Sequence, residues 1–122
     1  MGKQLLLVGL GGAAGSILRF LTAIITAKYF SGVFPLGTFV ANFIGCFLIG
    51  LFIGLFPGNN YTNLKLLLIT GFCGGYTTFS TFSAENIALL NDKQPGMALL
   101  NILASVVGGL LAVWLGLTAT KN

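Results

Sequence analysis

Apolar residues fill four long stretches of this chain, and short polar segments separate them. The stretches cover residues 5–27, 36–56, 64–90 and 97–119. Each is close to or longer than the ~20 residues that an α-helix needs to cross the hydrocarbon core of a bilayer. The connecting segments are rich in Gly, Pro, Asn and Ser, as tight turns require. The pattern predicts an all-α membrane protein with four transmembrane helices, in which residues 1–122 form one domain.

The chain has too few charged residues to cover the surface of a water-soluble domain. Of its 122 residues, 56% are hydrophobic and 7% are charged, whereas soluble domains have roughly a quarter of their residues charged. The chain has no His and only two acidic residues, which removes most acid–base, triad and metal chemistry, so we do not expect an enzyme. Its six Lys and Arg are scattered, and a nucleic-acid partner would need them on one face.

The basic residues give almost no preference for one orientation in the membrane. Four helices place Lys3, Lys65 and Lys121 on one side and Lys28 and Lys93 on the other. Orientation follows the Lys and Arg content of short loops. This balance predicts dual topology, in which copies of the chain insert both ways. A single orientation set by the N-terminal amine or by other proteins is the alternative.

Small residues recur at helical spacing in three of the four stretches. Such rows allow helix backbones to approach closely in lipid, where no hydrophobic drive brings helices together. Four helices are too few to enclose both a core and an aqueous path, so we expect a homo-oligomer, most simply a homodimer. The rows are Gly11 and Gly15; Ala41 and Gly45; Cys46, Gly50 and Gly54; and Ala104, Gly108 and Ala112.

The third stretch contains a weak point for a helix. Gly74 and Gly75 are followed by the β-branched residues Thr77 and Thr78, about 15 Å into the span and near the bilayer midplane. We predict a break there. Unwound backbone inside a membrane needs partners for its carbonyl groups. An alkali cation held by the carbonyls of Gly74 and Thr77 would supply one. A continuous, close-packed helix is the alternative.

Two phenylalanines follow this point at helical spacing. Phe79 and Phe82 share one face, and hydroxyl side chains surround them. The positive edge of a phenyl ring attracts an anion, and a hydroxyl group donates a hydrogen bond to it. The combination indicates an anion path, although packing or lipid contact also explains phenylalanine in a membrane helix. The hydroxyls are those of Thr77, Ser80, Thr81 and Ser83.

The other polar residues within the spans are mostly hydrogen-bond donors. Arg19 carries a positive charge, and Asn42, Asn101 and Ser105 supply neutral donors, whereas Glu85 alone has the opposite sign. This inventory also favours an anion.

Each of these side chains also has a structural explanation. Arg19 can snorkel or bond to helix-end carbonyls. Asn42 with Thr38, one turn away, can form an interhelical hydrogen bond. Glu85 can be a solvated residue at the mouth of the protein.

Three motifs resemble the CrcB/Fluc family of fluoride channels from microbial membranes. Residues 11–20 read GGAAGSILRF, residues 37–47 read GTFVANFIGCF, and residues 71–82 read GFCGGYTTFSTF. The third motif is long and specific, and the similarity covers nearly the whole chain. Tyr76 stands where phenylalanine is frequent in relatives.

The resemblance implies an antiparallel, dual-topology homodimer with two fluoride pores and a central structural Na⁺. Gly74 and Thr77 would present backbone carbonyls to the Na⁺, and Phe79 and Phe82 would be the rings that fluoride passes. Arg19 matches the family's first-helix arginine, whose role stays open. The other pore-lining positions implied are Asn42, Ser80, Thr81, Ser105 and Asn101.

The function implied is passive export of fluoride across a bacterial-type plasma (inner) membrane, which confers fluoride resistance. The chain contains neither a nucleotide-binding motif nor a carboxylate in the middle of a span, so nothing in the sequence indicates an energy source for transport. One alternative is a small dual-topology multidrug antiporter, but the first span, residues 5–27, lacks the acidic residue that proton exchange needs. The other is a non-transporting scaffold subunit, in which the polar residues only join helices.

Overall fold

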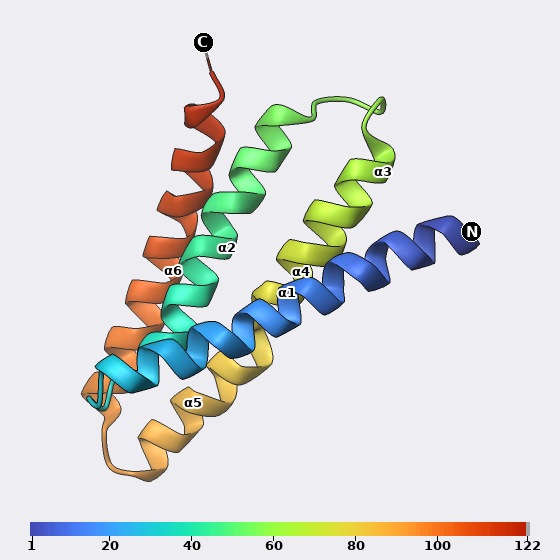
Figure 1. Cartoon of the computed structure of the whole chain (residues 1–122). Helices are drawn as coiled ribbons and strands as arrows, with labels where there is room; N and C mark the ends of the chain where they lie inside the picture. Colours follow the sequence, from blue (N-terminus) through green and yellow to red (C-terminus); the bar gives the residue numbers. More distant parts are fainter. Residues whose placement is uncertain (122) are drawn as a thin grey trace.

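The computed structural model describes residues 1–121 and places each predicted span in helical structure (Figure 1). Within those residues, three helices are long and apolar enough to cross a membrane. They are α1 (Gly2–Tyr29), α2 (Leu36–Leu55) and α6 (Pro95–Ala119). The remaining stretch is divided into α3 (Thr62–Lys65), η1 (Leu66–Cys73), α4 (Gly74–Tyr76) and α5 (Phe79–Asn91). The predicted all-α architecture is confirmed.

The helix boundaries follow local turn chemistry. Gly58 has a φ of 75° in the α2–α3 connection, a conformation that glycine adopts without strain. Pro95 occupies the first turn of α6, where its fixed φ suits a helix and its missing N–H is not needed. The connections are therefore short, and neighbouring helices turn back on one another.

The third stretch departs from a regular α-helix in two places. Its first half, η1, is π-helical over eight residues, which the sequence pattern does not predict. Its second irregularity lies at Thr77 and Thr78, which are extended with φ and ψ of −90° and 157°, and −150° and 121°. The predicted break is confirmed, but it falls on the two threonines, and Gly74 and Gly75 are helical.

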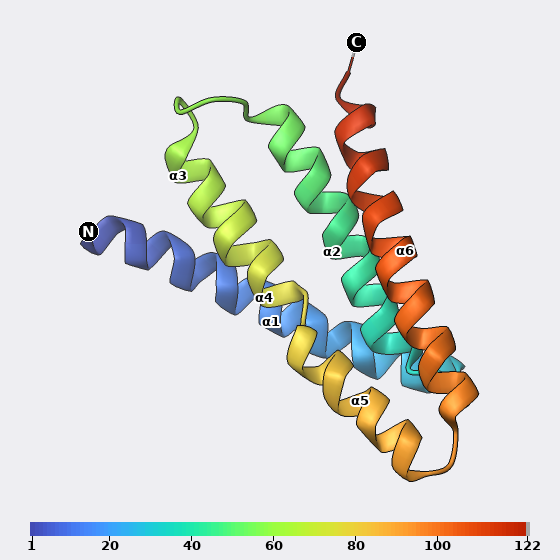
Figure 2. The same cartoon turned by 180° about the vertical axis from the view of Figure 1, so that it is seen from behind.

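The helices pack in two groups that the broken segment connects. Helix α2 runs beside α6, and α1 crosses η1 and α4 near the break (Figures 1 and 2). Seen from behind, α5 continues beyond the break and returns through a short loop into α6 (Figure 2). The break is thus in contact with both α1 and α2.

Glycines allow these close crossings. A Cβ atom on Gly11 or Gly15 of α1 would overlap a backbone carbonyl oxygen of η1, and a Cβ atom on Gly50 would overlap the Val113 carbonyl of α6. Ala112 of α6 is completely buried. The prediction that small residues bring the backbones together is thus confirmed at Gly11, Gly15 and Gly50. Cβ atoms on the other glycines of the predicted rows, Gly45, Gly54 and Gly108, would meet side chains of neighbouring segments.

Most large apolar side chains lie on the outside of the single chain. Leu10, Ile17, Leu110 and Trp114 are more than half exposed. Contiguous apolar surface of this kind fits lipid or another protein surface, not water.

Candidate functional site

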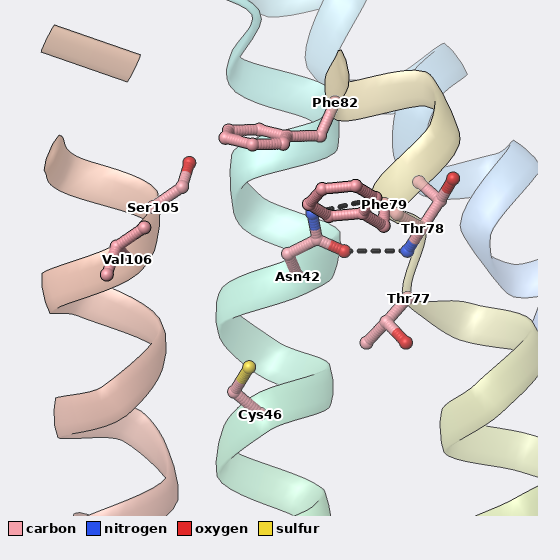
Figure 3. Close-up of a pocket in the computed structure, with 8 residues that line it drawn as sticks. All are labelled: Asn42, Cys46, Thr77, Thr78, Phe79, Phe82, Ser105 and Val106. Atoms are coloured by element: carbon pink, nitrogen blue, oxygen red, sulfur yellow. Dashed lines mark hydrogen bonds between the residues drawn. The ribbon is translucent and has the colours of Figure 1, made fainter. Parts of the chain in front are cut away.

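Asn42 of α2 holds the broken segment through two hydrogen bonds to one residue. Its Oδ1 accepts from the backbone N–H of Thr78 at 2.8 Å, and its Nδ2 donates to the Thr78 carbonyl at 3.1 Å (Figure 3). The side-chain amide therefore replaces the helical partners that the extended backbone lacks. Nδ2 has a second hydrogen, for which the described part of the chain supplies no acceptor.

Thr78 also begins the next helix. It is the N-cap of α5, and its Oγ1 accepts from the backbone N–H of Thr81 at 3.2 Å. In an uninterrupted helix, the N–H groups of Thr78 and Thr81 would bond to the carbonyls of Gly74 and Thr77. Both N–H groups instead bond to side-chain oxygens, so these two carbonyls lose their usual donors.

Helix α1 secures the other side of the break. Arg19 donates from Nε to the Gly75 carbonyl at 3.1 Å, close to the C-terminal end of α4. A cation there is favourable because unsatisfied carbonyls make that end of a helix negative. The Tyr76 hydroxyl lies 2.8 Å from Thr22 Oγ1, which gives α1 a second attachment.

The two phenylalanines face a pocket of about 270 Å³, which we call the aromatic pocket. The Phe79 and Phe82 rings lie 5.9 Å apart with an interplanar angle of 42°. Asn42 of α2 lies next to Phe79 and below Phe82 in the view of Figure 3, and Ser105 lies on α6. Neutral polar side chains and aromatic rings from three elements thus meet beside the break. The lining residues are Asn42, Cys46, Thr77, Thr78, Phe79, Phe82, Ser105 and Val106.

A second, more polar pocket of about 340 Å³ lies between α1, α2 and α5. Thr38 Oγ1 donates to Glu85 Oε2 at 2.9 Å across it. The other carboxylate oxygen, Oε1, is buried, and no group within residues 1–121 bonds to it. Thr78 lines both pockets, so the break separates them. The lining residues are Ser16, Arg19, Phe20, Ala23, Gly37, Thr38, Thr78, Thr81 and Glu85.

Asn101 lies away from both pockets in the contact between α5 and α6. It is 1% exposed, and its Nδ2 donates to Asn86 Oδ1 at 2.9 Å. Its own Oδ1 accepts from Ser105 Oγ at 3.1 Å. Asn101 therefore reaches the aromatic pocket only through Ser105.

The residues that the sequence singles out fall into separate groups. Asn42, Phe79, Phe82 and Ser105 meet at the aromatic pocket, together with Thr77. The second pocket contains Arg19, Thr38, Thr81 and Glu85. Ser80 lies on an open groove along α5 that Thr81 and Glu85 share. Gly74 lies inside α4.

Sequence reasoning assigns no role in the site to three residues of the aromatic pocket, Cys46, Thr78 and Val106. It marks Thr78, the residue that Asn42 binds, only as a β-branched residue in a weak helix. Cys46 follows Asn42 by one helical turn, so its spacing is a usable signal. The hydrogen bond between Asn86 and Asn101 has no local signal, because it joins two different helices.

Comparison with known proteins assigns this chain to a family. A family model described as CrcB-like protein, Camphor Resistance (CrcB), matches residues 6–117. The chain belongs to the CrcB family.

Several curated members of the family are similar over nearly their whole length. The protein from Flavobacterium psychrophilum named fluoride-specific ion channel FluC is 50% identical, with 98% of each chain covered. The FluC of Azobacteroides pseudotrichonymphae is 44% identical, with 98% of this chain and 97% of the relative covered. FluC 2 of Moorella thermoacetica is 45% identical, with 96% of each covered. These CrcB proteins are named as ion channels, and the apolar helices identify this chain as a membrane protein.

Proposed function

We propose that this CrcB protein is a passive, fluoride-selective channel. The observation that carries the proposal is the aromatic pocket, which is lined by the Asn42 amide, the Phe79 and Phe82 rings and the Ser105 side chain. All of these groups are neutral, and none is a carboxylate. The names of the relatives, fluoride-specific ion channel FluC, agree with this chemistry.

Fluoride suits this pocket because it is small and strongly hydrated. A selective path replaces the water shell of the ion with compact donors, and apolar walls exclude larger anions. Conduction also needs sites from which the ion can leave. Contacts from a neutral amide and from ring edges are weaker than those from a full positive charge, so they meet this requirement.

Flow is outward under cellular conditions. Hydrogen fluoride crosses membranes and ionises in a neutral cytoplasm, and an inside-negative potential then drives the anion out by ~2.3 kcal/mol per 100 mV. A channel in a bacterial-type plasma (inner) membrane therefore lowers cytoplasmic fluoride without an energy source, which confers resistance.

A second copy of the chain completes the pathway in an antiparallel, dual-topology homodimer. Phe79 is 79% exposed in the single chain although it lines the aromatic pocket, so the pocket lacks a wall on that side. The nearly balanced distribution of Lys residues, three on one side and two on the other, supports insertion in both orientations.

A structural Na⁺ between the two copies fits the residues at the break. The Gly74 and Thr77 carbonyls lose their helical donors to Asn42 and Thr78 side-chain oxygens, and carbonyl oxygens are the donors that a hard cation prefers. The ion would supply positive charge for the freed carbonyls of both chains. We expect purified protein to retain Na⁺ after dialysis into sodium-free buffer; its complete loss with the fold intact would contradict this assignment.

Fluoride efflux from proteoliposomes tests the function. We expect electrogenic fluoride flux without a pH gradient and little chloride flux, as measured with ion-selective electrodes. Protein-free vesicles are the control. Flux that requires a proton gradient would indicate an antiporter, and no flux from well-folded protein would indicate a scaffold subunit.

A further inference from the structure

Ser105 is the hydroxyl of α6 that lines the aromatic pocket, and its hydrogen is already in use. A serine hydroxyl has one hydrogen and two lone pairs. Ser105 Oγ donates this hydrogen to Asn101 Oδ1 at 3.1 Å. The oxygen therefore presents lone pairs to the pocket, and lone pairs repel an anion.

The Asn101 amide is held in the orientation that turns its Oδ1 toward the Ser105 hydroxyl. Its Nδ2 donates to Asn86 Oδ1 at 2.9 Å, and the residue is 1% exposed, so water does not compete. Turning the amide over would place two acceptor oxygens against each other. Asn86 thus fixes Asn101, and Asn101 fixes the Ser105 hydrogen.

We infer that Asn101 is a positioning residue that, together with Asn86, weakens the anion affinity of the aromatic pocket by withdrawing the Ser105 hydrogen. For Ser105 to donate to an anion, its hydroxyl must rotate and leave Asn101 Oδ1 without a donor in a dry contact between helices, which is unfavourable. The site therefore binds the ion loosely, as fast passage requires. This inference rests on the proposed function, because it concerns fluoride at the same pocket.

A double-mutant cycle tests the inference. The Asn86→Leu/Asn101→Leu variant replaces both buried amides with apolar side chains of similar size, which leaves no unpaired partner. The same pair of changes is then made with Ser105→Ala. Fluoride affinity is measured by ¹⁹F NMR titration of the full chain in detergent, and fluoride flux is measured in vesicles. Thr118→Val is the matched control for loss of a hydroxyl on α6, because Thr118 bonds only to its own helix at Leu115.

With Ser105 present, we expect the Leu pair to tighten fluoride binding about fivefold, which corresponds to one hydrogen bond of ~1 kcal/mol. In the Ser105→Ala background, we expect the Leu pair to change nothing. Equal changes in both backgrounds, or none in either, would overturn the inference.

If the double variant does not fold, Asn101→Leu alone replaces it, because it removes the same acceptor. If the native protein conducts fluoride but all four proteins of the cycle bind it with equal affinity, this inference alone is contradicted. If the native protein conducts no fluoride, the proposed function is contradicted as well.

Discussion

Phe79 and Phe82 differ in how completely the single chain surrounds them. Their rings lie 5.9 Å apart on one side of α5, yet Phe79 is 79% exposed. An exposed phenylalanine adds little to the stability of the chain that carries it. Its ring edge, however, carries partial positive charge that an aliphatic side chain lacks. The Phe79 ring therefore contributes little to folding and is available for the ion path proposed above.

We expect Phe79→Ile and Phe82→Ile each to lower fluoride flux by at least about tenfold, because an isoleucine has no positive edge to offer an anion. Helix content and elution of the purified protein stay unchanged. Phe52→Ile is the matched control, because Phe52 stacks on Phe56 away from the aromatic pocket. Full flux in both α5 variants would remove the rings from the mechanism.

At the scale of elements, the broken third segment depends on contacts from outside itself. Thr77 and Thr78 leave the helix, and Asn42 of α2 and Arg19 of α1 bond to the backbone around them. The Thr78 hydroxyl then starts α5 as its N-cap. The break is thus held by two other helices and lies beside two pockets, in agreement with the rule that irregular backbone in a membrane is buried in protein or lines a cavity.

We expect Thr78→Val to destabilise the protein by ~1 kcal/mol, because valine keeps the branched shape and removes the capping oxygen. Thermal unfolding in detergent measures the effect. Thr118→Val is the control, since that hydroxyl is exposed and bonds within its own helix. Equal stability of the two variants would show that the cap contributes nothing.

Crossing of α1 over η1 depends on the absence of a side chain at Gly15. We expect Gly15→Ala to destabilise the protein by ~1–3 kcal/mol, because its Cβ atom would overlap the Phe72 carbonyl. Gly9→Ala on the same helix meets no atom within 4 Å, so it should be neutral or slightly stabilising. Thermal unfolding of the two variants side by side checks this, and a tolerant Gly15 would mean that the helices can separate.

At the scale of the whole molecule, the outer surface is largely apolar, and the predicted topology puts three Lys residues on one side of the membrane and two on the other. Leucines, isoleucines and Trp114 lie outside on α1 and α6. Only a small part of each long apolar helix is buried within the chain. A single copy therefore covers little of its own apolar area and leaves room for lipid and a second copy.

We expect tags at either terminus to be accessible from both faces of the membrane in cells, because the loops carry no directional excess of positive charge. Labelling of tagged protein with a membrane-impermeant reagent on intact cells and on inverted vesicles measures this. Adding two Lys residues to one connection should bias the labelling to one face. Labelling of the unmodified chain from one face alone would contradict dual topology and would indicate a parallel dimer or another partner protein.

The sequence by itself determined the four apolar segments, the small-residue rows and the weak point after Gly75, because hydrophobicity and helix propensity are local properties. Similarity of three motifs was enough for the family, which the comparisons confirm. The tertiary structure decided the rest: the π-helical turn of η1, the bonding of Arg19 to Gly75 and the pairing of Asn86 with Asn101. The two hydrogen bonds join residues on different helices, and such partners depend on where the helices cross and in which rotation they meet.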